Sequence, residues 1–428
     1  MKSIAIEHTL VRNIFWLFSL QGLNYLIPLA VLPFLVRMLG IERYGLLAFA
    51  QSFAQYFVLL TDYGFNLSAT KQIARSRSEQ DRVSNLFWCV ILLKVLLMLL
   101  GIIILASLVA SIPRFRSEPL LYAAAYLGVI GTVLFPTWLF QGMEQMKYIS
   151  IVSGGAKLVS AVALFVFVRH SSDYVLALAI LSAGTFGAGL LGFIVAIRTF
   201  AIIPKLPSLD DVKDTLRDGW HLFVSTAATS FYTNSNVFLV GIIAGNEQAG
   251  YFSAAEKIIR GMQAMLGPVT QAIYPHVNSL VGRSRDLALA FLRKGFVWIS
   301  VISFVPSLLL FLCAAPVAHV VVGPAADSCI PIFRWMAMLP FIIAISNVLG
   351  IQTMIPFGLE RELSRIYVVA GLGSLALSIS LIRHYAALGA AMSVLTVELA
   401  IIVCMWAALR TRGVNLLPFG AVGAPTAT

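Results

Sequence analysis

Charged residues are scarce in this chain of 428 residues: 11% are Asp, Glu, Lys or Arg, whereas 59% are hydrophobic. A soluble protein would carry about 25% charged residues. Many separate apolar runs reach about 20 residues, the length that spans the hydrocarbon core of a bilayer. The sequence also lacks the alternation over about 10 residues that is typical of a transmembrane barrel. These features predict an all-α polytopic membrane protein.

Cysteines and nucleotide-binding motifs are equally sparse. The four cysteines have no metal-ligand spacing and form no disulfide framework, so we interpret them as apolar filler. There is no Gly-x-x-x-x-Gly-Lys-Ser/Thr loop for ATP and no basic-aromatic module for nucleic acid. The first apolar run, residues 11–38, is too long for a cleaved signal peptide. We expect no cofactor, no metal and no nucleic-acid partner.

The apolar runs predict twelve transmembrane helices. Their approximate bounds are residues 11–38, 44–74, 83–111, 119–142, 148–168, 174–199, 219–244, 249–280, 291–316, 330–356, 363–382 and 386–409. Residues 200–218 form the only polar linker of any size, and six spans lie on each side of it. We therefore predict an N-terminal six-helix bundle (1–199), a cytoplasmic linker (200–218), a C-terminal six-helix bundle (219–411) and a disordered cytoplasmic tail (412–428).

An internal repeat supports this division. Gly40, Glu42 and Gly45 recur as Gly245, Glu247 and Gly250, at a constant offset of 205 residues. At the same offset Gln51 falls on Glu256 and Gln55 on Arg260. Duplicated membrane units are common in transporters. The sequence therefore predicts two pseudo-symmetric halves, the second of which is charged where the first carries amides.

The distribution of cations predicts the orientation. With a cytoplasmic N-terminus, the inner segments hold 19 Lys and Arg residues and the outer segments hold 6. An excess of Lys and Arg marks the cytoplasmic side of a membrane protein. We expect both termini to be cytoplasmic, and we attribute most of the formal net charge of +11 to this bias.

Apart from the cations counted in the inner and outer segments, eight charged residues lie inside predicted spans. A charge at the bilayer centre costs about 2.5–3.5 kcal/mol, so it usually faces a cavity or a partner. Lys94 and Lys157 have no acid within four residues on their own helices, which favours a water-filled cavity for both. The full set is Lys94, Lys157, Lys257, Arg260, Arg334, Asp62, Glu256 and Glu398.

Several of these residues have a second interpretation. Lys257 and Arg334 could extend to the outer headgroups, and Glu256 and Arg260, four residues apart, could simply pair. Glu398 is either a counter-ion to a lysine or a carboxylate that is protonated during transport. The amides of Asn24, Asn234 and Asn236 could bind sugar hydroxyls or another helix. Pro136, Pro268 and Pro340 should bend their spans.

Three stretches resemble a known family. They are Leu35-Val-Arg-Met-Leu-Gly-Ile-Glu-Arg-Tyr-Gly45, Asp62-Tyr-Gly-Phe-Asn66 with Lys71, and Phe135-Pro-Thr-Trp-Leu-Phe-Gln-Gly-Met-Glu144. In this order they resemble the polysaccharide-transport family of Wzx-type O-antigen and exopolysaccharide repeat-unit flippases, within the multidrug/oligosaccharidyl-lipid/polysaccharide (MOP) superfamily. The resemblance extends over nearly the whole chain and is most specific in the first half.

This resemblance implies a MATE-like fold, with two six-helix bundles around a central cavity. It also implies an activity that is not enzymatic: moving an undecaprenyl-diphosphate-linked oligosaccharide from the cytoplasmic to the periplasmic leaflet of the bacterial inner membrane by alternating access. A polysaccharide polymerase and a chain-length regulator are the implied protein partners.

A diphosphate in a low-dielectric cavity needs cationic partners. Lys94, Lys157 and Arg260, and then Lys257 and Arg334, are the candidates for that role. Asn24, Asn234 and Asn236 are candidates for the sugars, and Glu398, Asp62 or Glu256 for a coupling ion or proton.

Two other functions deserve comparison. A cation-coupled multidrug exporter of the same superfamily should present acids to its cationic cargo, and the excess of Lys and Arg inside the spans argues against it. A membrane polysaccharide polymerase needs a sizeable aqueous loop. The outer loops predicted here are short, the longest being about residues 317–329, so we rank this function last.

Overall fold

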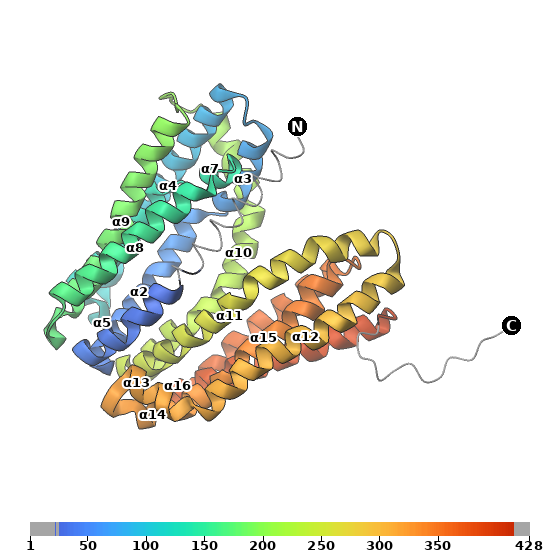
Figure 1. The fold of residues 1–428 in the computed structure, drawn as a ribbon. Helices are drawn as coiled ribbons and strands as arrows, with labels where there is room; N and C mark the ends of the chain where they lie inside the picture. Colours follow the sequence, from blue (N-terminus) through green and yellow to red (C-terminus); the bar gives the residue numbers. More distant parts are fainter. Residues whose placement is uncertain (1–21, 23–24, 415–428) are drawn as a thin grey trace. The chain divides into compact units, whose positions relative to one another are not determined.

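The structure is a computed structural model that describes residue 22 and residues 25–414, apart from some side chains of α10 and α11. The regular elements in these residues are helices (Figure 1). They form two compact units, Met1–Gly241 and Ile242–Thr428. Asn24 and residues 415–428 of the predicted tail lie outside the described residues.

Among the described residues of the first unit, an apolar helix covers Tyr25–Leu39. The unit continues with α2 (Ile41–Asp62), α3 (Phe65–Arg75), α4 (Gln80–Ser111), α5 (Pro113–Arg116), α6 (Pro119–Leu134), α7 (Thr137–Gly142), α8 (Met146–Phe167), the 3₁₀ helix η1 (Ser171–Asp173), α9 (Tyr174–Thr199) and most of α10 (Leu209–Ala244).

Two breaks inside apolar stretches shape this unit. Between α2 and α3, Tyr63 (φ 44°) and Gly64 (φ 75°) adopt the left-handed conformation, which ends one helix and starts the next. The backbone of α10 lies directly against this break, because a Cβ at Gly64 would be 2.9 Å from the amide nitrogen of Phe223. Between α6 and α7 the chain is extended at Phe135, next to Pro136, which has no N–H to continue a helix.

Helices α6 and α9 touch through their backbones. A Cβ on Gly131 would lie 2.5 Å from the carbonyl carbon of Thr185, and a Cβ on Gly189 would collide with the carbonyl of Gly131. Small residues allow membrane helices to approach this closely. The remaining core of the unit combines aliphatic side chains with large aromatic ones, of which Trp138, Phe87 and Phe65 are fully buried.

The predicted linker is bound to α4 over its first residues. The Gln80 amide donates to the carbonyls of Phe200 and Ala201, at 2.8 and 2.7 Å. One turn further along α4, the Ser84 hydroxyl accepts a hydrogen bond from the backbone N–H of Ile203. One turn beyond that, the Trp88 indole donates to the backbone carbonyl of Ile203. Residues 200–203 therefore lie along the start of α4.

The second unit contains α11 (Asn246–Val281), α12 (Arg285–Leu312), α13 (Ala314–Val322), the 3₁₀ helix η2 (Gly323–Ala325), α14 (Ala326–Ala337), α15 (Leu339–Asn347), a π-helical segment η3 (Val348–Met354) and α16 (Glu360–Thr411). The boundary between α14 and α15 falls one residue before Leu339 and Pro340. Pro268, by contrast, lies within the uninterrupted α11.

The long helix α16 doubles back on itself. Fifteen residues of straight helix rise about 22 Å. The hydroxyls of Ser378 and Ser393 are nevertheless only 2.8 Å apart. The reversal occurs at Ala386, whose dihedral angles (φ 50°, ψ −131°) are not helical. Residues 360–385 and 387–411 therefore form two arms of a helical hairpin, in agreement with the boundary that the sequence predicts between spans 363–382 and 386–409.

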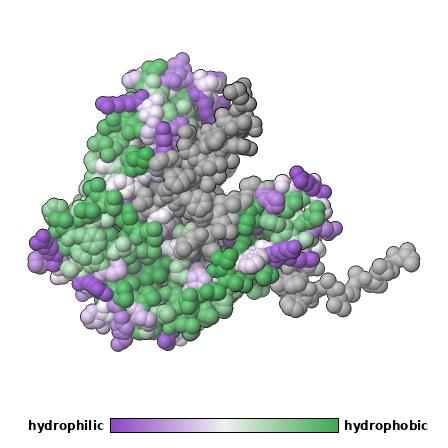
Figure 2. Space-filling view, viewed as in Figure 1, coloured by the Kyte–Doolittle hydropathy of each residue, from purple (hydrophilic) through white to green (hydrophobic). Residues whose placement is uncertain are grey.

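Among the described residues, eight helical stretches are long and apolar enough to cross a membrane, and α16 counts as one of them. Shorter apolar helices cover Tyr25–Leu39 and Thr233–Ala244. Twelve spans stay a prediction. In Figure 2 hydrophobic side chains cover the flanks of the helices and hydrophilic ones gather toward their ends, as expected for helices that cross a bilayer.

The repeated glycines have the same backbone geometry in both units. Gly40 (φ 78°, ψ 158°) precedes α2 and Gly245 (φ 94°, ψ 174°) precedes α11. Each carbonyl accepts a hydrogen bond from the residue four positions on, Tyr44 or Ala249. The repeat seen in the sequence is therefore also a repeat of local structure.

Candidate functional site

The first unit encloses a polar cavity of about 340 Å³. Its wall comes from helices α2, α3, α4, α6, α7, α8, α9 and α10 and from the α6–α7 break. The lining residues are Gln55, Val58, Leu59, Thr61, Asp62, Asn66, Lys94, Gly131, Thr132, Phe135, Thr137, Ser153, Thr185, Ala188, Thr226 and Ser230. Most are polar, although the helices that carry them are mainly apolar.

A buried ion pair forms part of this wall. The Lys94 ammonium lies 3.5 Å from the Asp62 carboxylate, and the side chains are 4% and 18% exposed. Asp62 is the last residue of α2, so the break at Tyr63 and Gly64 fixes where its carboxylate points. Lys94 comes from the middle of α4. The two charges compensate each other, and the cavity carries no net charge from them.

Hydroxyl groups make up much of the remaining wall. Those of Thr61, Thr132 and Thr185 donate to carbonyls of their own helices, at 3.0, 2.8 and 3.1 Å. A hydroxyl that donates in this way keeps its oxygen lone pairs as acceptors. The buried Oδ1 of Asn66 has no hydrogen-bond partner among the described residues. The wall therefore offers acceptors to a ligand that carries O–H or N–H donors.

The second unit holds another predicted pair. Arg260 and Glu256 of α11 form an ion pair at 2.9 Å, with side chains 41% and 18% exposed. The two residues are one helical turn apart, so the pairing that the sequence left open does form. Lys257, the residue next to Glu256, is half-buried.

The other candidate residues are spread over several helices. Lys157 is half-buried on α8, one turn after the cavity residue Ser153. Asn234 and Asn236 lie on α10, where Asn236 is buried and the Asn234 carbonyl accepts from Ser52 at 3.4 Å. Arg334 is exposed on α14, and Glu398 is half-buried on the second arm of α16.

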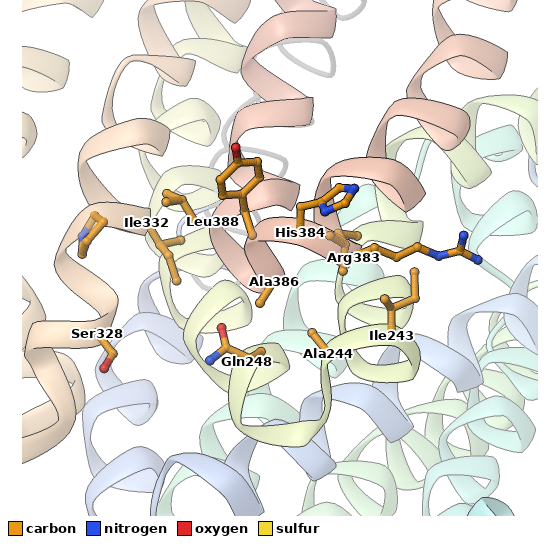
Figure 3. Close-up of a pocket in the computed structure, with 12 residues that line it drawn as sticks. Ile243, Ala244, Gln248, Ser328, Ile332, Arg383, His384, Ala386 and Leu388 are labelled. Atoms are coloured by element: carbon orange, nitrogen blue, oxygen red, sulfur yellow. The ribbon is translucent and has the colours of Figure 1, made fainter.

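A second cavity, of about 600 Å³, lies at the turn of α16 (Figure 3). The Gln248 side chain of α11 reaches toward Ala386, and its amide oxygen accepts from the backbone N–H of Ala387 at 3.3 Å. The guanidinium of Arg383 extends away from Gln248 in this view. This cavity is built around the turn, and its charged and polar groups do not converge.

Of the sequence-predicted residues, the first cavity contains Lys94 and Asp62. The sequence offered no acid near Lys94 because its partner comes from another helix. The hydroxyl residues of the wall were not predicted. Part of the signal was present, since Asn66, Phe135 and Thr137 stand in the stretches that carry the family resemblance. The hydroxyls of α8 and α9 have no comparable signal.

Residues 10–281 match the family described as "Polysaccharide biosynthesis protein". Two relatives are each named "Putative O-antigen transporter". The one from Escherichia coli (strain K12) is 35% identical over 390 residues, which cover 91% of this chain and 94% of the relative. The one from Shigella dysenteriae is 31% identical over 406 residues, or 93% and 100% of the two chains.

Two solved structures share the fold at low sequence identity. An inward-facing multidrug resistance MATE family transporter of the MOP superfamily is 16% identical, with a TM-score of 0.66 over 92% of this chain and 95% of that one. The lipid II flippase MurJ, in its inward closed conformation, is 11% identical, with a TM-score of 0.65 over 95% and 87% of the two chains. The fold is thus the multi-span helical fold of MATE transporters and MurJ, and the chain belongs to the polysaccharide biosynthesis protein family.

Proposed function

We propose that this protein transports lipid-linked O-antigen oligosaccharides across the membrane that it spans. The observation that carries the proposal is its similarity to two O-antigen transporters over more than nine-tenths of their lengths and its own. The protein is a transporter and not an enzyme.

We propose, in finer detail, that the cargo is an undecaprenyl-diphosphate-linked repeat unit. It moves from the cytoplasmic to the periplasmic leaflet of the bacterial inner membrane, and both termini are cytoplasmic. The bias of 19 inner against 6 outer cations supports this orientation. Twelve spans in two six-helix bundles, residues 1–199 and 219–411, would carry out alternating access. A polymerase and a chain-length regulator would receive the product.

The intramembrane cations are the proposed partners of the cargo's diphosphate. Arg260 is the strongest candidate, because its side chain stays 41% exposed while it pairs with Glu256. Lys157, Lys257 and Arg334 are the others with some exposure. Lys94 contributes less, because Asp62 already compensates its charge inside the cavity. Asp62, Glu256 and Glu398 are the proposed carriers of a coupling ion or proton.

Complementation tests this function. In a strain that lacks its own O-antigen transporter, the unaltered chain should restore O-antigen to the cell surface. Arg260→Ala and Lys157→Ala, expressed at the parental level, should lower surface O-antigen about tenfold or more. Normal surface O-antigen with both variants would remove these residues from the mechanism. A parent chain that fails to complement but confers resistance to cationic dyes would instead favour a multidrug exporter.

A further inference from the structure

We propose that the polar cavity of the first unit is a carbohydrate subsite that holds one neutral sugar ring of the cargo. This inference rests on the proposed function and adds to it, since it assigns the sugar to a place built within a single unit. The cavity's size, its charge and the chemistry of its wall each support it.

The size of the cavity suits one ring. At about 340 Å³ it is at the lower end of the range of about 300–1,000 Å³ that ligand pockets cover. Gln55 and Thr185, which line it, are exposed residues, so the cavity is not sealed. A terminal ring of an oligosaccharide could enter it while the rest of the chain stays outside.

The charge of the cavity suits a neutral ligand. Its two ionisable lining residues, Lys94 and Asp62, are paired at 3.5 Å. That distance exceeds the usual limit of about 3.2 Å for an N–H···O hydrogen bond. Both groups can therefore still bind a ligand, the ammonium as donor and the carboxylate as acceptor. A charged ligand would add an uncompensated charge beside the Lys94–Asp62 pair, whereas two neighbouring hydroxyls of a sugar would not.

The remaining wall is matched to sugar hydroxyls. Seven side-chain hydroxyls line the cavity, from Thr61, Thr132, Thr137, Ser153, Thr185, Thr226 and Ser230. Three of these, on Thr61, Thr132 and Thr185, already donate to their own helices and keep acceptor lone pairs. A sugar ring presents several O–H donors, which is what this wall requires.

An apolar patch completes the site. Phe135 lines the cavity beside Gly131 and Ala188, where α6 and α9 are closest. The face of an aromatic ring is electronegative and attracts C–H groups that carry partial positive charge. A pyranose has one face rich in such C–H groups. The cavity thus combines hydroxyl acceptors with a ring surface, and both are suited to a carbohydrate.

Cysteine protection tests binding directly on the purified full chain. Ser153→Cys would be made in a background of Cys313→Ser and Cys404→Ser, because these two native thiols are exposed whereas Cys89 and Cys329 are buried. The probes are free neutral hexoses and N-acetylhexosamines, with glucuronate as the anionic comparison. At least one neutral sugar should slow maleimide labelling of Ser153→Cys about threefold or more. Labelling of Ser107→Cys, on the exposed side of α4, should not change.

Transport supplies the second arm. Thr132→Val and Thr185→Val remove a hydroxyl without changing side-chain shape, and each should lower surface O-antigen about fivefold at normal expression. Thr199→Val, at the exposed end of α9, is the matched control and should transport normally. If the parent complements, no sugar protects Ser153→Cys and both valine variants transport normally, the subsite does not exist. Equal protection by glucuronate would contradict its neutral character. If the unaltered chain does not complement, the proposed function is refuted. The labelling experiment on the purified protein tests the sugar subsite separately, because it does not depend on transport.

Discussion

At the scale of single residues, the pair formed by Lys94 and Asp62 explains how an apolar bundle carries two charges. Neither residue could be buried alone, because an isolated charge in a low-dielectric interior costs several kcal/mol. The carboxylate reaches the ammonium because α2 ends at Asp62. The break in the helix and the ion pair are therefore parts of one arrangement.

Removing one member of this pair should destabilise the protein strongly. Lys94→Met leaves the Asp62 carboxylate without a cation, for which the expected loss is about 3 kcal/mol, at the low end for a broken buried pair since Asp62 is partly exposed. The double variant Lys94→Met/Asp62→Asn should recover most of the thermal midpoint of the purified protein but not its transport. Equal midpoints for the single variant and the parent would show that the pair has no structural role.

Hydrogen bonds between Ser208 and Asp211 cap the N-terminus of α10. Ser208 accepts from the amide of Asp211 at 3.1 Å, and the Asp211 carboxylate accepts from the Ser208 hydroxyl at 2.7 Å. The Ser208 hydroxyl, followed by the Asn85 side chain, holds the pKa of Asp211 below its usual range. A lowered carboxyl pKa adds stability above the unfolded value of about 3.9, and this stability is lost as the pH falls through the folded value.

Ser208→Ala should therefore cost about 1 kcal/mol at neutral pH, the usual value for an N-cap. The difference in thermal midpoint between parent and variant should shrink as the pH is lowered below about 4. Ser208→Thr keeps a capping hydroxyl and serves as the control. A difference that does not change between pH 7 and pH 3 would show that the carboxylate of Asp211 takes no part.

At the scale of helices, α6 and α9 approach each other closely, and this contact depends on glycine. Gly131→Ala would place a Cβ 2.5 Å from the Thr185 carbonyl, and a backbone group cannot rotate away as a side chain can. We expect a loss of about 1–3 kcal/mol, the usual cost of overpacking. Gly187→Ala, on α9 with open space around it, is the matched control and should be neutral. Similar thermal midpoints for the two variants would contradict this contact.

The turn of α16 provides the opposite test, a substitution that should stabilise. Ala386 adopts φ 50° and ψ −131°, a conformation that favours glycine. Ala386→Gly should relieve about 1 kcal/mol of backbone strain and raise the thermal midpoint. Ala387→Gly, at the next residue and within the helix, should lower it. The reverse order of the two midpoints would mean that Ala386 is not strained.

At the scale of the whole molecule, two positions that match in the sequence repeat each contact the start of another helix. Arg43 and Gln248 are 205 residues apart. Arg43 lies over the ring of Tyr174, the first residue of α9, with its guanidinium 4.7 Å from the ring centre. Gln248 binds the N–H of Ala387, where the second arm of α16 begins. Each residue links the start of one helix to the start of another, α9 for Arg43 and the second arm of α16 for Gln248.

The matched glycines allow this symmetry to be measured. Gly40 and Gly245 combine positive φ with ψ near 180°, a region that is essentially restricted to glycine. Gly40→Ala and Gly245→Ala should each cost about 1–3 kcal/mol, and the two losses should be similar. Thermal unfolding of both variants measures them. A loss of stability in only one of the two variants would show that the matched glycines do not contribute equally to the stability of the protein.

The sequence by itself determined that this is a multi-span helical membrane protein, and it located the repeated glycines that precede α2 and α11. Hydrophobicity and backbone requirements are local properties, so they can be read from one stretch at a time. Only the tertiary structure decided that Lys94 pairs with Asp62, that the first residues of the linker lie along α4 and that hydroxyls of several helices line one cavity. These outcomes depend on where helices break and how closely they approach, and residues far apart in the chain set both.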